Sequence, residues 1–225
     1  MGLDMYLNRS YFKYRKADGT FSTNWDDCKI DMYGRSNRVT FSEMVGYWRK
    51  ANHIHKWFVD NVQKGKDDCN EYYVSIQKLH QLRDTCFDIL SKLHGVEIRV
   101  PKKDVEKFKD ANTKFYGNSK IQRIIIDVNN LETVKSLTGY HTLTKSQIEK
   151  CGCHISLPRQ DGFFFGSREY DGWYLCSLVD TIEMLDELFK KHDENDKKIK
   201  ENITTPGTYF EYSYQASWIN LQWWV

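Results

Sequence analysis

The chain of 225 residues lacks the features that mark several large protein classes. No apolar run approaches the roughly 20 residues of a membrane span, so no membrane partner is expected. The first residues, MGLDMYLNRS, have no basic region followed by a long apolar run, which predicts no signal peptide. With 33 basic and 31 acidic residues, the chain also lacks the basic excess of a dedicated duplex-binding protein. These absences favour a cytoplasmic protein, and they make no strong case for duplex nucleic acid.

Recognisable catalytic and cofactor motifs are absent as well. The sequence has no G-x-S-x-G and no H-E-x-x-H, and GFFFGS at 162–167 lacks the GK[ST] ending of a phosphate loop. CGCH at 151–154 supplies at most half of a structural zinc site. The carboxylates Asp67, Asp68 and Glu71 do not fit the spacing of a calcium loop. We therefore expect no metal and no cofactor, and the case for an enzyme is weakened without being excluded.

What the sequence does contain is periodicity, and it predicts an α+β fold. Residues 3–9 alternate between apolar and polar side chains, as a half-buried strand does. The stretch 207–218, GTYFEYSYQASW, alternates in the same way, and we expect these N- and C-terminal strands to pair. The predicted architecture is a small mixed or antiparallel sheet packed with about three amphipathic helices.

Three amphipathic patterns predict those helices. The first begins after Ser42, a favourable N-cap, and continues to position 62. The second begins after Ser75 and ends before Gly95, a residue suited to the position just past a helix end. The third covers roughly 174–191.

The middle of the chain differs in character and predicts an insertion. Within 97–155, EIRV and QRIIIDV resemble strands, whereas KKDVEKFKDAN and LETVKSL resemble short helices. We therefore predict a core domain formed by 1–96 and 156–225, with 97–155 as an α+β insertion subdomain. The charged stretch 193–202 is expected to be a solvated loop, and the six scattered cysteines are expected to be reduced thiols.

One candidate site lies in GYWRKANHIHKWF, residues 46–58. On a helix, Asn52 and His55 share one side, within or beside the apolar face, whereas His53 falls on the polar face. A buried polar group without a partner costs about 1–3 kcal/mol, so this pair either holds a core network or meets a ligand. Trp57 is expected on the polar side near Lys50, where it either forms a stacking platform or is covered by another layer.

A second candidate segment is REYDGWY, which precedes the third predicted helix. A helix N-terminus at this point could meet an anion. Together the two segments predict a pocket in which aromatic rings stack, cations hold charge, and Asn52 and His55 supply hydrogen bonds. The alternative is that the aromatic residues only build a core. The predicted ligand-binding residues are Trp48, Arg49, Lys50, Asn52, His55, Trp57, Arg168, Tyr170 and Trp173.

Four stretches of the chain carry a resemblance to a known but uncharacterised family, and the resemblance as a whole extends over about two-thirds of the chain. They are MGLDMYL, VGYWRKANHIHKWFVDNVQKGKDDCNEYYV, GFFFGSREYDGWYL and YFEYSYQASW. The family consists of small proteins found in phages and in bacterial genomes that carry prophages. The chain departs from the family pattern in the long 97–155 region and in the tail WINLQWWV.

The resemblance implies a protein that acts in the cytoplasm of an infected host cell. By analogy with other phage proteins of this size, it implies a binding protein that counters host defence. The first hypothesis is sequestration of a nucleotide-like or other small anionic ligand. A second is inhibition of a host defence protein through the insertion or through Trp223 and Trp224. A third is an enzyme acting on nucleotides or nucleic acid, with His55 as acid or base. An oligomer stays possible under each.

Overall fold

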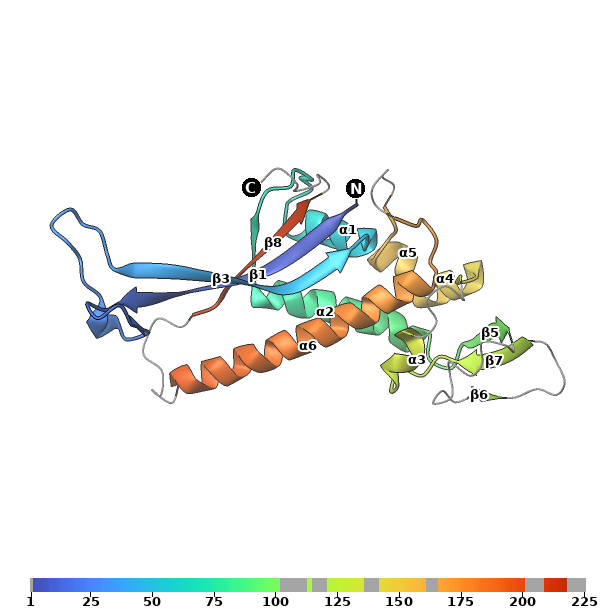
Figure 1. The fold of residues 1–225 in the computed structure, drawn as a ribbon. Coiled ribbons are helices and arrows are strands. Elements are labelled where there is room, and N and C mark those ends of the chain that lie inside the picture. The colour runs from blue at the N-terminus through green and yellow to red at the C-terminus, as the bar shows by residue number, and fades with distance from the viewer. Residues whose placement is uncertain are drawn as a thin grey trace.

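The computed structural model describes residues 2–101, 113–114, 121–135, 142–160, 166–200 and 209–217. They form an α+β fold in which an antiparallel sheet packs against helices (Figure 1). The predicted fold class is therefore confirmed. The strands of the main sheet are β1 (Asp4–Arg15), β2 (Phe21–Ser22), β3 (Arg38–Arg49), β4 (Tyr72–Val74) and β8 (Glu211–Ser217).

The centre of this sheet joins the two ends of the chain. β1 pairs antiparallel with β8, from Asp4 opposite Ser217 to Ser10 opposite Glu211. β3 lies on the other side of β1, and β4 pairs with β8 at the far edge. The predicted pairing of the N- and C-terminal strands is thus confirmed. The physical reason for the pairing is that both strands bury alternate apolar side chains against the same core.

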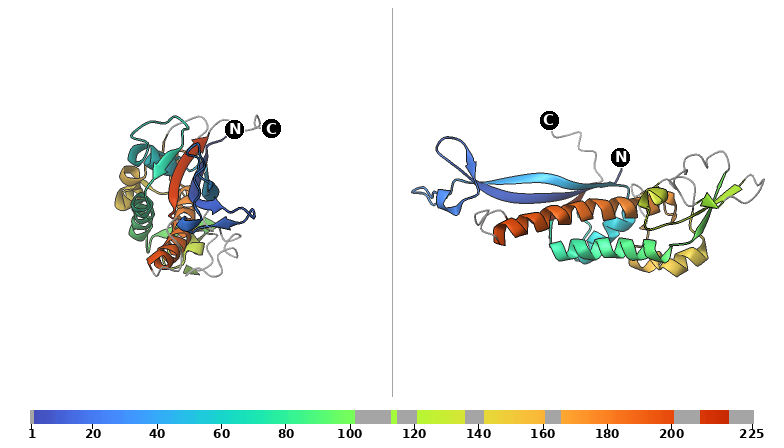
Figure 2. Two further views of the ribbon diagram at one scale, coloured as in Figure 1. Left: turned by 90° about the vertical axis from the view of Figure 1, so that its left-hand side faces the viewer. Right: turned by 90° about the horizontal axis from the view of Figure 1, so that it is seen from below.

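Beyond the body, β1 and β3 continue as a two-stranded arm. The β1–β3 pairing extends to Tyr14 opposite Arg38, whereas β8 accompanies β1 only as far as Ser10. The hairpin therefore projects away from the helices (Figures 1 and 2). The short strand β2 and the 3₁₀ turn Trp25–Asp27 lie near its end.

The first predicted helix is only partly correct. Its N-terminal half is strand β3, and the helix α1 covers only Asn52–Asn61. Met44 and Tyr47 are exposed whereas Gly46 and Trp48 are buried, which is the spacing of a strand next to a bulge in the pairing. The local spacing of the apolar residues predicts a helix. The backbone hydrogen bonds to β1 stabilise a strand instead, and they outweigh this local preference.

The second and third predicted helices are present, and the third is longer than expected. α2 spans Ile76–Lys92, and the Ser75 hydroxyl accepts a hydrogen bond from the Lys78 N–H, as an N-cap does. α6 spans Gly172–Lys200, so the predicted loop at 193–202 is wrong as far as Lys200. Charged pairs four residues apart, such as Lys191 with Glu187, favour the continued helix.

Residues 97–157 supply a second, three-stranded sheet and short helices. The sheet order is β5 (Glu97–Pro101), β7 (Ile121–Ile125) and β6 (Thr113–Lys114). The helices are α3 (Leu131–Lys135), α4 (Lys145–Cys151) and α5 (Cys153–Ser156). The helix predicted at 102–112 lies outside the described residues. Buried side chains of this region, including Ile126 and Leu157, join the main hydrophobic core, and a separate insertion subdomain stays a prediction.

Two further features bear on the chemistry of the chain. All six cysteines lie in the described segments, and none forms a disulfide. None of the helices in the described segments combines the length and the apolar character that crossing a membrane requires.

Candidate functional site

A pocket of about 650 Å³ opens where the end of β3, the turn into α1 and the first turns of α6 meet. A pocket of this size falls within the usual range for small-molecule sites. Its walls combine aromatic, cationic and small polar side chains from distant parts of the sequence. The lining residues are Tyr47, Trp48, Arg49, Lys50, Ala51, Arg159, Gly166, Ser167, Trp173, Cys176, Ser177 and Asp180.

The fold brings four of the predicted ligand-binding residues together here: Trp48, Arg49, Lys50 and Trp173. A fifth, Asn52, lies fully buried behind the wall and donates a hydrogen bond to the Ser167 carbonyl at 3.2 Å. The two predicted segments therefore meet in space. Residues 209–217 are not among the lining residues.

His55 and Trp57 lie elsewhere, inside the core. The His55 ring is buried, with Nδ1 at 2.8 Å from the Tyr214 hydroxyl and Nε2 at 3.0 Å from Asp67. Trp57 is only 7 % exposed and packs edge-on against Phe58, so of the two alternatives it is the one covered by another layer and not a stacking platform. The reason is that other layers of the fold cover α1 on nearly every side.

The structure also places three other residues differently from the sequence predictions: Arg168, Tyr170 and His53. Arg168 is exposed but does not line the pocket. Tyr170 is half-buried, and its hydroxyl accepts a hydrogen bond from the Arg159 backbone N–H at 3.3 Å. His53, predicted on the polar face of a helix, is completely buried, because α6 packs over that side of α1 through Ser177.

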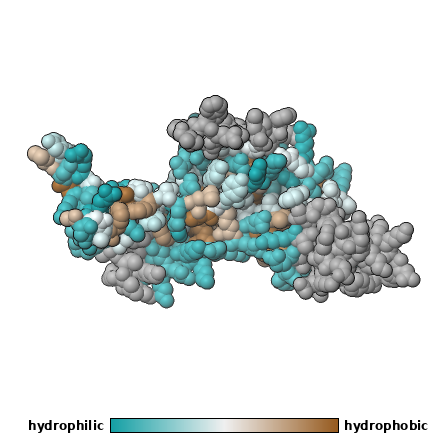
Figure 3. Space-filling model, viewed as in Figure 1, coloured by the Kyte–Doolittle hydropathy of each residue, from teal (hydrophilic) through white to brown (hydrophobic). Residues whose placement is uncertain are grey.

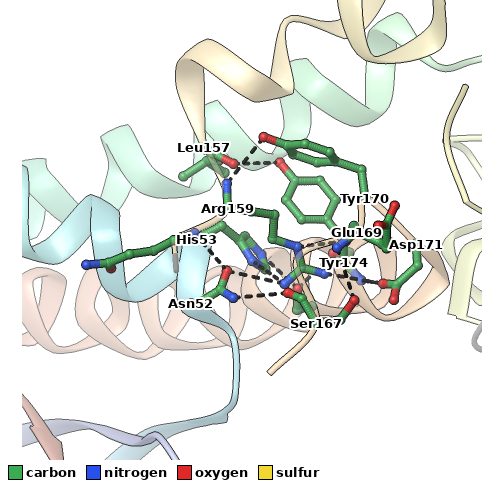
Figure 4. Close-up of polar contacts among 11 residues, drawn as sticks. Asn52, His53, Leu157, Arg159, Ser167, Glu169, Tyr170, Asp171 and Tyr174 are labelled. Atoms are coloured by element: carbon green, nitrogen blue, oxygen red, sulfur yellow. Dashed lines mark hydrogen bonds and ion pairs between the residues drawn. The ribbon is translucent and has the colours of Figure 1, made fainter. Parts of the chain in front are cut away.

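The residue that sequence reasoning missed is Arg159. Its side chain is only 7 % exposed and lines the pocket, and Figure 4 shows its polar contacts. Nε donates to the Glu169 carbonyl at 2.9 Å, and Nη2 lies 3.2 Å from Asp171. An arginine in the loop segment PRQDG is normally solvated, and its burial depends on partners that only the tertiary structure supplies.

The same guanidinium connects α1 to α6. Nη1 of Arg159 lies 3.4 Å from Asn52 Oδ1 and 3.3 Å from His53 Nδ1 (Figure 4). The guanidinium carbon also lies over the ring of Tyr174, 4.9 Å from its centroid. Burial lowers the pKa of Arg159, while the neighbouring Asp171 carboxylate raises it. The wall is therefore a connected set of groups, in which each polar atom positions the next.

The N-terminus of α6 already holds an anion. The Asp171 carboxylate accepts a hydrogen bond from the Tyr174 N–H at 3.0 Å and also pairs with Arg159. This places the negative charge of Asp171 at the positive end of the helix dipole. The anion expected at this helix end is thus the chain's own carboxylate, and a ligand would meet the side chains of the first turns instead.

The contact between His53 and Ser177 resembles the pairing of a general base with a nucleophile. The surrounding hydrogen bonds argue against that role. His53 Nε2 lies 2.8 Å from Ser177 Oγ, which itself donates to the Tyr174 carbonyl at 2.7 Å. The guanidinium of Arg159 faces Nδ1, so Nδ1 accepts and Nε2 carries the proton. A general base would need the reverse arrangement at Nε2. The contact therefore orders the pocket wall.

A second chain of hydrogen bonds, to residues of α6, holds Trp48 in place. Its indole N–H donates to the Thr181 hydroxyl at 2.8 Å, and that hydroxyl donates to the Ser177 carbonyl at 2.6 Å. The indole is only 4 % exposed, so it contributes a rigid edge to the pocket floor.

Lys50 enters the pocket from an unusual backbone conformation. Its φ is +56°, in the left-handed region, which costs non-glycine residues roughly 1–3 kcal/mol. The Lys50 N–H donates to the Leu3 carbonyl at 2.8 Å, which holds the turn in place. Gly166 lies against it: a Cβ there would approach the Lys50 carbonyl to 3.2 Å. Gly166 itself has a φ of +88°, a left-handed conformation that strains other residues, so glycine is favoured at this position.

Within the described residues, no three His, Cys, Asp or Glu side chains are grouped so that they could hold a metal ion. Cys151 and Cys153, half of the zinc pattern considered above, are buried in the hydrophobic core. No protein-family model, curated protein or solved structure matches this chain. The function must therefore be argued from the geometry of the site.

The buried histidine predicts a pH-dependent stability. Burial, and secondarily Arg159, lowers the pKa of His53 well below its usual value of 6.5. Below that pH the unfolded chain binds a proton that the folded chain does not, so the free energy of unfolding falls as the pH falls. One such site contributes at most about 1.4 kcal/mol per pH unit.

Urea unfolding at several pH values between about 7.5 and 5 measures this slope. In His53→Gln, whose amide can accept from Arg159 and donate to Ser177, we expect a shallower slope over the same range. Equal slopes in the two proteins would exclude His53 as a source of the effect.

Proposed function

We propose that this chain is a binding protein that holds a small anionic, nucleotide-like ligand in the pocket between β3, α1 and α6. The observation that carries the proposal is the meeting of Arg49, Lys50 and the buried Arg159 with the exposed indole of Trp173 around one cavity. Cations suit phosphate or carboxylate groups, and an indole face suits a base.

The charge of the pocket supports an anionic ligand. Arg49 is 63 % exposed, and its nearest carboxylate, on Asp4, lies 3.9 Å away. One N–H of Arg159 Nη2 has no acceptor among the described residues. The acid at the pocket edge, Asp180, lies 3.6 Å from Lys135, which also pairs with Glu183 and Glu132 and therefore offsets its charge only in part. A ligand anion would therefore meet more positive than negative charge.

Trp173 supports a ligand with an aromatic part. It lies on the first turn of α6 and is 64 % exposed, an unusual exposure for the largest apolar side chain. Each of the other pocket aromatics, Tyr47 and Trp48, already uses a polar atom, for Asp4 and Thr181 respectively. The Trp173 indole is thus the surface on which a base would stack.

We further propose that the ligand is sequestered rather than converted. The hydrogen bonds around Ser177 and His53 argue against an activated nucleophile in the wall. The resemblance to phage proteins supports a role in the infected host cell, where removal of a nucleotide signal would counter a defence response. Both steps rest on the binding proposal.

The decisive test is native mass spectrometry of the protein purified from cells, followed by denaturation and analysis of the small molecules released. We expect a co-purifying mass of the nucleotide class. If the protein is ligand-free, calorimetric titration with nucleoside mono-, di- and triphosphates is the second test. A ligand-free mass together with no heat from any of these compounds would overturn the proposal.

Trp173→Ala is expected to weaken binding of the identified nucleotide by roughly 5- to 150-fold, the effect of losing one stacked base. The matched control is Tyr73→Ala, because Tyr73 is another exposed aromatic residue, 69 % accessible, that lies on β4 away from the pocket. Calorimetric titration of both variants measures the difference. Equal affinity of Trp173→Ala and the unchanged protein would contradict a stacking role.

A further inference from the structure

The end of the arm carries a second pocket, separate from the one described above. It is a groove of about 400 Å³, here called the arm groove, and four cationic side chains line it: Arg15, Lys16, Lys29 and Arg38. They come from the end of β1, from the loop at 27–29 and from the start of β3. The arm projects from the body (Figures 1 and 2), and the four cationic side chains are exposed.

Asn37 builds this groove. Its side-chain oxygen accepts from the Lys29 N–H at 2.7 Å, and its amide nitrogen donates to the carbonyls of Arg15 at 2.7 Å and Asp27 at 2.9 Å. The Arg15 N–H in turn donates to the Asn37 carbonyl at 3.0 Å. The single residue Asn37 thus holds the backbones of the three segments together. The cations are therefore brought close to one another by a fixed backbone and not by the flexibility of their side chains.

The cations of the groove are poorly neutralised by the chain itself. Within the described part of the chain, Lys16 alone of the four has a carboxylate within 4 Å, that of Asp27 at 3.4 Å. Arg38 lies over the ring of Phe12 and Arg15 over that of Phe21, at 4.5 and 5.5 Å from the centroids. Among the described residues, neither these arginines nor Lys29 forms an ion pair. Like charges held close together favour an external anion.

Exposed aromatic rings lie on the same arm as these cations, and one of them, Phe21, contacts a groove cation directly. Phe21 pairs with Arg15 across β1 and β2 and is 42 % exposed. Tyr33, in the loop at the tip, is 74 % exposed and lies beneath the guanidinium of Arg35. Figure 3 shows hydrophilic and apolar residues side by side along the arm. Rings next to cations suit unstacked bases, whereas the bases of a duplex are already stacked on one another.

We propose that the arm groove is a binding site for single-stranded nucleic acid. Arg15, Lys29 and Arg38 hold backbone phosphates, and Phe21 and Tyr33 stack bases. The site is independent of the nucleotide pocket: the two lie at opposite ends of β3, on the order of 35 Å apart for an extended strand of this length. An acidic protein surface is the competing partner, and the experiment separates the two.

The test is fluorescence anisotropy of the full chain with a short labelled oligothymidylate over a range of salt concentrations. Three phosphate contacts predict a slope of log affinity against log salt of roughly −2, from about −0.7 for each contact. The double variant Arg15→Gln, Arg38→Gln is expected to weaken binding at least tenfold and to bring the slope to roughly −0.7.

The matched control removes the same charge elsewhere. Lys145→Gln, Lys150→Gln changes two exposed lysines on α4 and is expected to leave the affinity unchanged. Trp173→Ala, which tests the nucleotide pocket, should also bind the oligonucleotide normally. Tyr33→Ala should weaken oligothymidylate binding but not binding of an abasic oligomer with the same number of phosphates.

Three results would overturn the proposal. One is the absence of oligothymidylate binding at low salt, and another is equal loss of affinity in the arm and control double variants. The third is equal or tighter binding of an oligoglutamate or of a duplex of matched charge. An oligoglutamate result would assign the groove to an acidic protein partner. Because Arg15 and Arg38 are exposed, circular dichroism is expected to show both variants folded.

Discussion

Replacing Arg159 by alanine is expected to lower the free energy of unfolding by about 3–5 kcal/mol. The Asp171 carboxylate, itself only 19 % exposed, would lose the charge that compensates its burial. The carbonyl of Glu169 and Nδ1 of His53 would lose their donor as well. Each group left without its partner carries its own desolvation cost. The total loss in free energy of unfolding therefore exceeds the loss from breaking an ordinary ion pair at the surface.

Urea unfolding of the variant, compared with the unchanged protein, measures this loss. Arg159→Lys keeps the charge but not the planar fork, and it should fall between the two. The control is Arg35→Ala at the arm tip, where the pair with Asp31 is exposed and no measurable change is expected. A loss below about 1 kcal/mol in Arg159→Ala would show that solvent or a rearranged loop satisfies Asp171.

Replacing Phe58 by alanine is expected to cost a similar amount, about 3–5 kcal/mol. Phe58 is completely buried, and its ring stacks on that of Tyr214 with centroids 3.8 Å apart and planes 7° apart. It also meets Trp48 and Trp57 edge-on, at 5.7 and 5.3 Å. One side chain therefore connects α1 to β8 and to the end of β3, and its removal leaves a cavity between three elements.

The measurement is again the free energy of unfolding, together with near-ultraviolet circular dichroism of the aromatic core. Phe87→Ala serves as the matched control, because Phe87 on α2 is 38 % exposed and leaves little cavity. We expect the Phe58 variant to lose part of the aromatic signal that the control retains. Similar stabilities for the two variants would contradict a central role for Phe58.

The candidate site was partly accessible to sequence reasoning. The residue types of 46–58 indicated a site, and Trp48, Arg49 and Lys50 do line the pocket with Trp173. His55 and Trp57 are placed differently, because the predicted helix was too long and the true helix α1 is covered on nearly every side. Arg159 had no local signal at all, since its partners lie on α1, in the loop just before α6 and, through the ring of Tyr174, on α6 itself.

By itself, the sequence determined the elements whose signals are local. Ser75 and the apolar spacing that follows it predict α2, and period-two alternation predicts the outer strands β1 and β8. In α2 the capping hydrogen bond and the apolar face involve residues close together in the sequence. In β1 and β8 the buried face follows from the alternation of neighbouring residues. Only the tertiary structure decided that 38–49 is a strand, because this depends on pairing with β1. The continuation of α6 to Lys200 is different, because the i,i+4 ion pairs that favour it, such as Lys191 with Glu187, are local in the sequence.

The same distinction holds for the two proposed binding sites. Local sequence shows which cations and rings are present, but not which of them converge. Arg159 and Asn37 decide that, the first by holding α1 to α6 and the second by tying both ends of the arm's loop. Their hydrogen bonds join residues far apart in the chain, and such contacts form only when the whole chain folds.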